Sequence, residues 1–129
     1  MATSRAIHQS KGCDIAQTEG HIRVAVGPGL AIEVQECYRT FVTECLTRQC
    51  ARALIVGIAD LDPFYHLAAR DALRAMALAG VPANFRLALV AMTPSLIAVY
   101  DTAVVEASRL GINARRFMTE DDAARWLGS

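Results

Sequence analysis

Three short apolar stretches constrain the fold of this chain more than any other feature. They span residues 53–59, 85–92 and, in a weaker form, 112–118, and each is followed by residues that open a helix. An apolar run without alternation, bounded by turn-forming residues, is typical of a strand covered on both faces. The sequence therefore predicts an α/β domain with an open, mostly parallel sheet.

The remaining elements follow from periodicity and from turn residues. Two short strands precede the first helix and meet at a tight turn, Glu19-Gly20. The expected order is β-β-α-β-α-β-α-β-α, with residues 1–11 as a flexible leader and residues 12–129 as one domain. The two early strands are expected at 14–18 and 21–26, and the helices at 30–49, 63–79, 94–110 and 119–127.

Three polar residues stand where helices should begin. Asp62 and Thr93 each precede a proline, and Thr119 precedes three acidic residues. Short polar side chains at this position accept hydrogen bonds from the free N–H groups of the first helical turn. We expect all three residues to act as N-caps.

The composition narrows the classes of partner. The formal net charge is zero, which argues against nucleic acid as a partner. The hydrophobic content of 53% is high for a chain of 129 residues and predicts a homodimer interface. No apolar run reaches the ~18 residues of a membrane span, so we expect no membrane insertion and a cytoplasmic location.

The cysteines show no metal-ligand spacing. A cytoplasmic location predicts that Cys13, Cys37, Cys45 and Cys50 are reduced, with Cys37 and Cys45 as small core residues of the first helix. Cys13 or Cys50 could be exposed and oxidisable. No Walker loop, Rossmann glycine pattern or nucleophile elbow occurs, so neither a cofactor nor a metal is expected.

Three segments carry a resemblance to a known family. They are RALIVGIADLD (52–62), FRLALVAM (85–92) and ARRFMTEDDAARWL (114–127). Their order, and the strand, capped acidic turn and Trp-Leu of the last one, resemble the STAS-like proteins related to SpoIIAA, the anti-sigma factor antagonist. The resemblance covers residues 14–127 and implies a mixed sheet with an antiparallel first strand and helices packed around it.

One departure from that family affects function. The antagonists are controlled by phosphorylation of a Ser or Thr after the central strand, at the start of the next helix. No Ser or Thr occurs here between Thr47 and Thr93. The resemblance therefore implies a module that binds a protein partner or a small apolar or anionic ligand, without that switch.

The carboxyl ends of parallel strands are where open α/β sheets bind ligands. We therefore expect any ligand site at this edge, which also brings helix N-termini suited to anions. Capping and turn formation alone would explain several of its residues, whereas Asp60 has no such role. The candidate ligand-binding residues are Gly27, Gly29, Asp60, Asp62, His66, Thr93, Ser95 and Thr119.

An enzyme is the alternative hypothesis. Asp60, Asp62 and His66 could serve a small phosphohydrolase of the haloacid-dehalogenase type, in which an aspartate attacks phosphorus. Such chemistry needs a lysine near the charged intermediate, and the only lysine is Lys11. We therefore favour a non-catalytic module and assign no catalytic residue.

Overall fold

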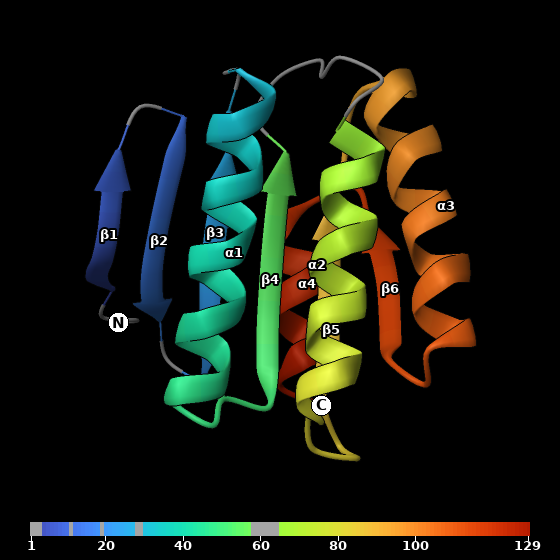
Figure 1. Ribbon diagram of the computed structural model, residues 1–129. Coiled ribbons are helices and arrows are strands. Elements are labelled where there is room, and N and C mark those ends of the chain that lie inside the picture. Colours follow the sequence, from blue (N-terminus) through green and yellow to red (C-terminus); the bar gives the residue numbers. More distant parts are fainter. Residues whose placement is uncertain (1–3, 11, 19, 28–29, 58–64) are drawn as a thin grey trace.

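The computed structural model describes residues 4–10, 12–18, 20–27, 30–57 and 65–129. Six strands form one sheet, and four helices pack on it (Figure 1). The strands are β1 (Arg5–Ser10), β2 (Cys13–Thr18), β3 (His21–Val26), β4 (Arg52–Gly57), β5 (Arg86–Val90) and β6 (Asn113–Phe117). The helices are α1 (Ala31–Thr47), α2 (Tyr65–Ala79), α3 (Pro94–Arg109) and α4 (Glu120–Leu127).

The sheet is mixed, and its strands lie in sequence order from β1 to β6. β1, β2 and β3 pair antiparallel, whereas β3, β4, β5 and β6 pair parallel. Each parallel pair is joined through one helix, as a parallel connection requires. The predicted α/β class and mixed sheet are confirmed.

The prediction missed one strand. Residues 5–10, which the sequence analysis assigns to the leader, form β1 and pair with β2. This strand lies at the edge of the sheet, is mostly exposed and contains a register shift between Ala6 and His8. An edge strand with a bulge needs no regular apolar alternation, so its sequence carries no clear strand signal.

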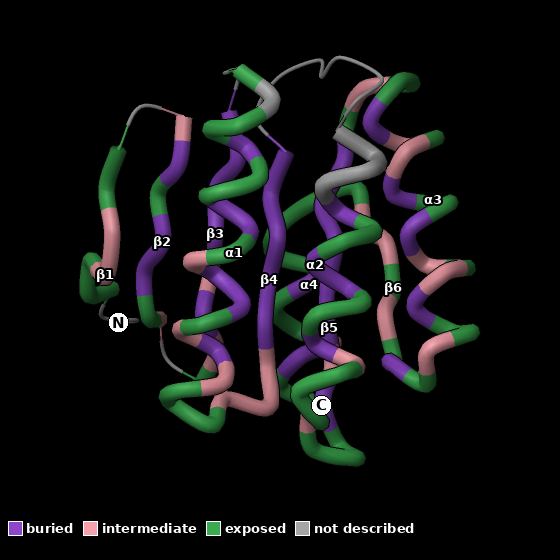
Figure 2. Tube along the Cα trace, viewed as in Figure 1, coloured by how far each residue is buried: buried purple, intermediate pink, exposed green. Residues whose placement is uncertain are grey.

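The helices cover the two faces of the sheet unequally. α1, α2 and α3 lie on one face, and α4 lies alone on the other, behind β4 and β5 (Figure 1). β4 and β5 are therefore buried on both faces, as Figure 2 shows, which explains their continuous apolar sequences. Ile55 and Leu89 join the larger core under three helices, while Leu54 and Ala88 face α4.

Gly57 lets α3 approach the end of β4 closely. A Cβ atom at this position would lie 2.9 Å from Cδ1 of Leu96 and 3.1 Å from the hydroxyl oxygen of Tyr100. Both distances are shorter than ordinary carbon contacts. A side chain at position 57 would therefore require the ends of Leu96 and Tyr100 to shift.

Arginines hold both ends of α4. At its C-terminal end, Nε of Arg52 donates to the carbonyl oxygen of Leu127 (2.6 Å), and Nη1 of Arg86 donates to that of Trp126 (2.8 Å). At its N-terminal end, Arg23 forms an ion pair of 2.6 Å with the first residue of the helix. The last carbonyls of a helix have no partner within it, and here these cations add donors to the cap hydrogen bonds made by the backbone N–H groups of Gly128 and Ser129.

Candidate functional site

The structure places the described candidate residues on the predicted edge of the sheet. Gly27 is buried at the end of β3, and its N–H donates to the carbonyl oxygen of Gly12 (2.8 Å). Thr93 follows β5, Ser95 is exposed in the first turn of α3, and Thr119 follows β6. The remaining candidates, namely Gly29, Asp60, Asp62 and the side chain of His66, lie outside the described residues, so the phosphohydrolase hypothesis stays a prediction.

The two described threonines behave differently as caps. Thr119 accepts a hydrogen bond from the backbone N–H of Asp122 (3.2 Å), which confirms its predicted role. Thr93 occupies the N-cap position of α3, but its side chain makes no capping hydrogen bond. Its Oγ1 atom is buried and has no hydrogen-bond partner among the described residues. The predicted capping by the Thr93 hydroxyl is therefore wrong, although the helix begins where expected.

Thr93 and Thr119 lead into opposite layers. α3 leaves β5 on the face of the sheet that carries three helices, whereas α4 leaves β6 on the other face (Figure 1). Two exposed side chains, Met92 and Met118, stand at this divergence. Neighbouring strands whose helices diverge define the topological switch point of an open sheet.

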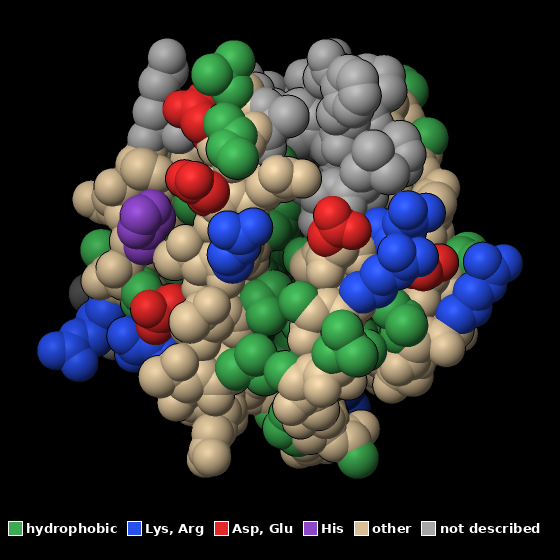
Figure 3. Space-filling model, viewed as in Figure 1, with side chains coloured by type: hydrophobic (Ala, Val, Ile, Leu, Met, Phe, Trp, Pro, Cys, Tyr) green, Lys and Arg blue, Asp and Glu red, His purple; other side chains and the backbone are tan. Residues whose placement is uncertain are grey.

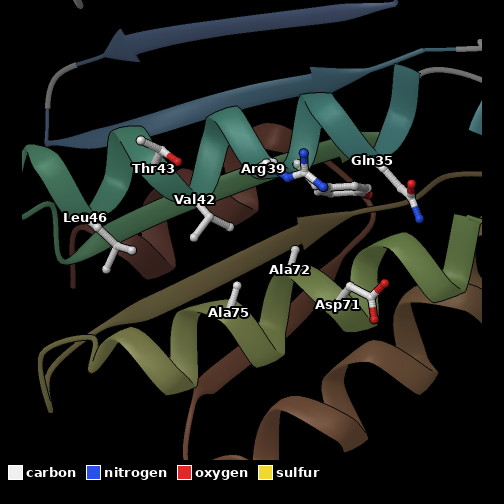
Figure 4. A pocket seen from close by; sticks show the side chains of 9 residues that line it. Gln35, Arg39, Val42, Thr43, Leu46, Asp71, Ala72 and Ala75 are labelled. Carbon is white, nitrogen blue, oxygen red and sulfur yellow. The ribbon is translucent and has the colours of Figure 1, made fainter. Parts of the chain in front are cut away.

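A hollow lies on the outer surface between α1 and α2. It has a volume of about 400 Å³. In Figure 4, Val42 and Leu46 point from α1 toward α2, and Ala72 and Ala75 point back from α2. Because the alanines fill little space, the two helices leave a groove between them. The lining residues are Gln35, Tyr38, Arg39, Val42, Thr43, Leu46, Asp71, Ala72 and Ala75.

Charges of opposite sign stand at one end of this groove. Arg39 comes from α1 and Asp71 from α2, and both side chains are exposed. Neither forms an ion pair with another described residue. Figure 3 shows charged side chains on both helices at this level and hydrophobic side chains gathered between the helices below them. The groove thus combines an apolar floor with a polar end.

Two buried tyrosines support the floor of the groove. Tyr38 lines both the groove and a small interior gap of about 10 Å³, which Tyr100 of α3 also lines. Burial raises the pKa of Tyr100 to about 12, and the neighbouring Tyr38 side chain lowers it by a smaller amount. The Tyr100 phenol is therefore neutral at physiological pH and suited to positioning rather than to proton transfer.

The cysteines differ from the prediction. Cys13 of β2 and Cys37 of α1 form a disulfide and are both buried. The expectation that all four cysteines are reduced is therefore wrong for this pair, while Cys45 and Cys50 are free thiols. The expectation rested on the assumed cytoplasmic location. The fold instead brings the two cysteines together, because Cys13 begins a strand and Cys37 faces the core from the helix above it.

Sequence reasoning missed the groove and its charged residues. Arg39 and Asp71 belong to no motif, and each reads as a solvated residue on the outer face of a helix. The only available signal was the high alanine content of the α2 sequence, YHLAARDALRAMALA. Alanines facing a neighbouring helix leave space that larger side chains would fill.

The described part of the chain contains neither a metal-binding cluster nor a membrane-spanning helix. In residues 4–10, 12–18, 20–27, 30–57 and 65–129, no group of three or more His, Cys, Asp or Glu side chains is arranged to hold a metal ion. No helix within these same residues combines the length and apolar content needed to cross a membrane.

The chain matches no family model, no curated protein and no solved structure.

Proposed function

We propose that the protein is a non-catalytic STAS-like module that binds a small ligand in the groove between α1 and α2. The ligand has an apolar body and an anionic group. The element order and the mixed sheet, with its antiparallel hairpin before the parallel strands, support the resemblance to the STAS-like proteins.

The observation that carries this proposal is the shape and lining of the groove. Its volume of about 400 Å³ is within the range of small-molecule sites, which combine a mostly apolar lining with a few polar groups. Val42, Leu46 and Ala75 offer the apolar surface. The guanidinium of Arg39, without an ion-pair partner among the described residues, offers several donors in a plane that fits a carboxylate or sulfonate.

Asp71 gives the groove selectivity by charge. Its carboxylate stands on α2, opposite the helix that carries Arg39. A ligand with two anionic groups would bring one of them toward this carboxylate and be disfavoured, since like charges repel. We therefore expect monoanionic amphiphiles to bind more tightly than dianionic ones of the same size.

The fluorescence of 8-anilinonaphthalene-1-sulfonate tests the proposal, because this dye is a monoanion with an apolar body. Ala75→Phe fills the groove and should weaken binding at least tenfold. Ala98→Phe, at an exposed position of α3, is the matched control and should bind as the wild type does. Arg39→Gln should weaken binding several-fold and remove most of its salt dependence. Equal affinities for Ala75→Phe and the wild type would refute the groove as the site.

The homodimer is also part of this proposal. Leu30 and Ile32 at the start of α1 are 69% and 58% exposed, so the beginning of this helix presents two apolar side chains to solvent. Apolar side chains of this kind favour burial against a second copy. Light scattering at micromolar concentration should give the mass of two chains, and Ile32→Glu should give that of one. A wild-type monomer at high concentration would contradict the dimer.

A further inference from the structure

The C-terminal end of α1 brings two free thiols together. The backbone N–H of Cys50 donates to the carbonyl oxygen of Cys45 (3.0 Å), and that of Gln49 donates to Leu46 (3.1 Å). Gln49 has a φ of 51°, in the left-handed region. These features define a Schellman motif, in which the side chains at the positions of Cys45 and Cys50 commonly touch.

The same hydrogen bond limits the separation of the two backbones. The N···O distance of 3.0 Å, extended by one N–Cα bond and one Cα-to-carbonyl-oxygen span, keeps the Cα atoms of Cys45 and Cys50 within about 6.9 Å. Disulfides bridge Cα atoms up to about this separation. The two thiols also interact electrostatically, since the charge of Cys50 contributes to the raised pKa of Cys45. Their backbone positions therefore permit a disulfide.

Small molecules can reach these thiols from one side. A hollow of about 470 Å³ is lined by both cysteines, by the end of α2 and by the chain that leads to β5. Cys50 is half-buried, whereas Cys45 is 2% exposed. The Cys50 thiol donates to the carbonyl oxygen of Arg52 (3.0 Å). Cys50 is therefore the thiol that an incoming molecule meets first.

The buried thiol suits the second step of an exchange. Burial, followed by the charge of Cys50, raises the pKa of Cys45 to about 12. Cys45 is therefore protonated until a bond to Cys50 sulfur brings a leaving group beside it.

We propose that Cys45 and Cys50 form a dithiol–disulfide couple that exchanges with low-molecular-weight disulfides entering this hollow. The Cys50 thiolate attacks one sulfur of the small disulfide, and the other sulfur leaves as a thiolate. Cys45 then attacks the Cys50 sulfur, its proton passes to the second leaving thiolate, and the Cys45–Cys50 bond forms. One small disulfide is reduced to two thiols while the protein loses two hydrogen atoms.

The proposal is independent of ligand binding in the groove, and the Cys13–Cys37 disulfide serves as its internal reference. Both of those cysteines are buried, at 5% and 3% exposure, and neither lines this hollow. We therefore expect a small disulfide to act on Cys45 and Cys50 and leave the existing disulfide unchanged.

Incubation with oxidised glutathione, alkylation and intact-mass analysis test the proposal. The wild type should lose the mass of two hydrogen atoms. Trypsin cleaves after Arg48, so the peptides carrying Cys45 and Cys50 should remain linked until reduction. Cys45→Ser should instead retain one glutathione on Cys50. Cys50→Ser should neither lose two hydrogen atoms nor retain glutathione.

Controls separate chemistry from misfolding. Far-ultraviolet circular dichroism should match the wild type for each variant, and Cys45→Ala replaces Cys45→Ser if the buried hydroxyl unfolds the protein. Two results would overturn the proposal. One is a wild type in which both thiols remain open to alkylation after incubation, and the other is a wild type that retains glutathione on Cys50 without forming the link.

Discussion

The disulfide between β2 and α1 should contribute a large share of the stability of the fold. Cys13 and Cys37 are separated by 24 residues. In the chain-entropy model, closing a loop of this length removes unfolded-state entropy worth about 3.5 kcal/mol at 25 °C. Domains of this kind are stable by only about 5–15 kcal/mol, so this contribution is substantial.

Urea unfolding of the wild type and of the Cys13→Ala/Cys37→Ala variant, each with and without reductant, measures this contribution. With a urea m-value of about 2 kcal/mol per M, the variant should unfold about 1.7 M earlier than the oxidised wild type. In reductant the remaining difference reports only the lost sulfur atoms, so the change between the two conditions isolates the link. Any contribution of Cys45 and Cys50 is common to both proteins and cancels. A difference between the proteins that is the same with and without reductant would refute the reasoning.

Two further predictions concern single hydroxyl groups. Thr119→Val removes a capping hydrogen bond and should lower the free energy of unfolding by about 1 kcal/mol. Thr93→Val replaces a buried hydroxyl that has no partner among the described residues, and it should change the free energy of unfolding by less than half as much as Thr119→Val does. Equal losses for the two variants in urea unfolding would contradict the assignment of caps. Burial raises the pKa of Tyr100 from about 10 to about 12, so the folded state holds this proton more tightly than the unfolded chain. The stabilisation from the Tyr100 proton is complete below pH 10 and is lost as the pH rises toward 12, so Tyr100→Phe should reduce the alkaline loss of stability by up to about 3 kcal/mol. An unchanged pH profile of the unfolding free energy in Tyr100→Phe would exclude this residue as the cause.

The central strands were predictable because both of their faces are buried. Residues 53–59 and 85–92 must be apolar on both sides, and this requirement leaves a continuous signal in the sequence. The observed strands, Arg52–Gly57 and Arg86–Val90, lie within two residues of those limits. Proline after these runs indicated that a helix follows each.

The edge of the sheet was less predictable. β1 is exposed and bulged, so burial imposes little pattern on it. α4, which lies alone on one face, is contacted by Arg23, Arg52 and Arg86, and these contacts join segments far apart in the sequence. A side chain that interacts at such long range carries no local signal of its partner.

The candidate groove depends on how two helices pack. Val42 and Leu46 were expected only as part of a helix, and the space beside them arises because α2 presents Ala72 and Ala75 there. Sequence spacing gives the faces of each helix but not which faces meet or how much space they leave. The strand edge was therefore the predicted site, whereas the structure adds a second candidate between the helices.

Amide NMR of the labelled protein, titrated with 8-anilinonaphthalene-1-sulfonate, tests the central claim most directly. The account predicts saturable shifts along the groove, in residues 35–46 of α1 and 71–75 of α2, with a single dissociation constant. Saturable shifts confined to residues 91–95 and 117–120 at the carboxyl edge, or the absence of any saturable shift, would contradict it.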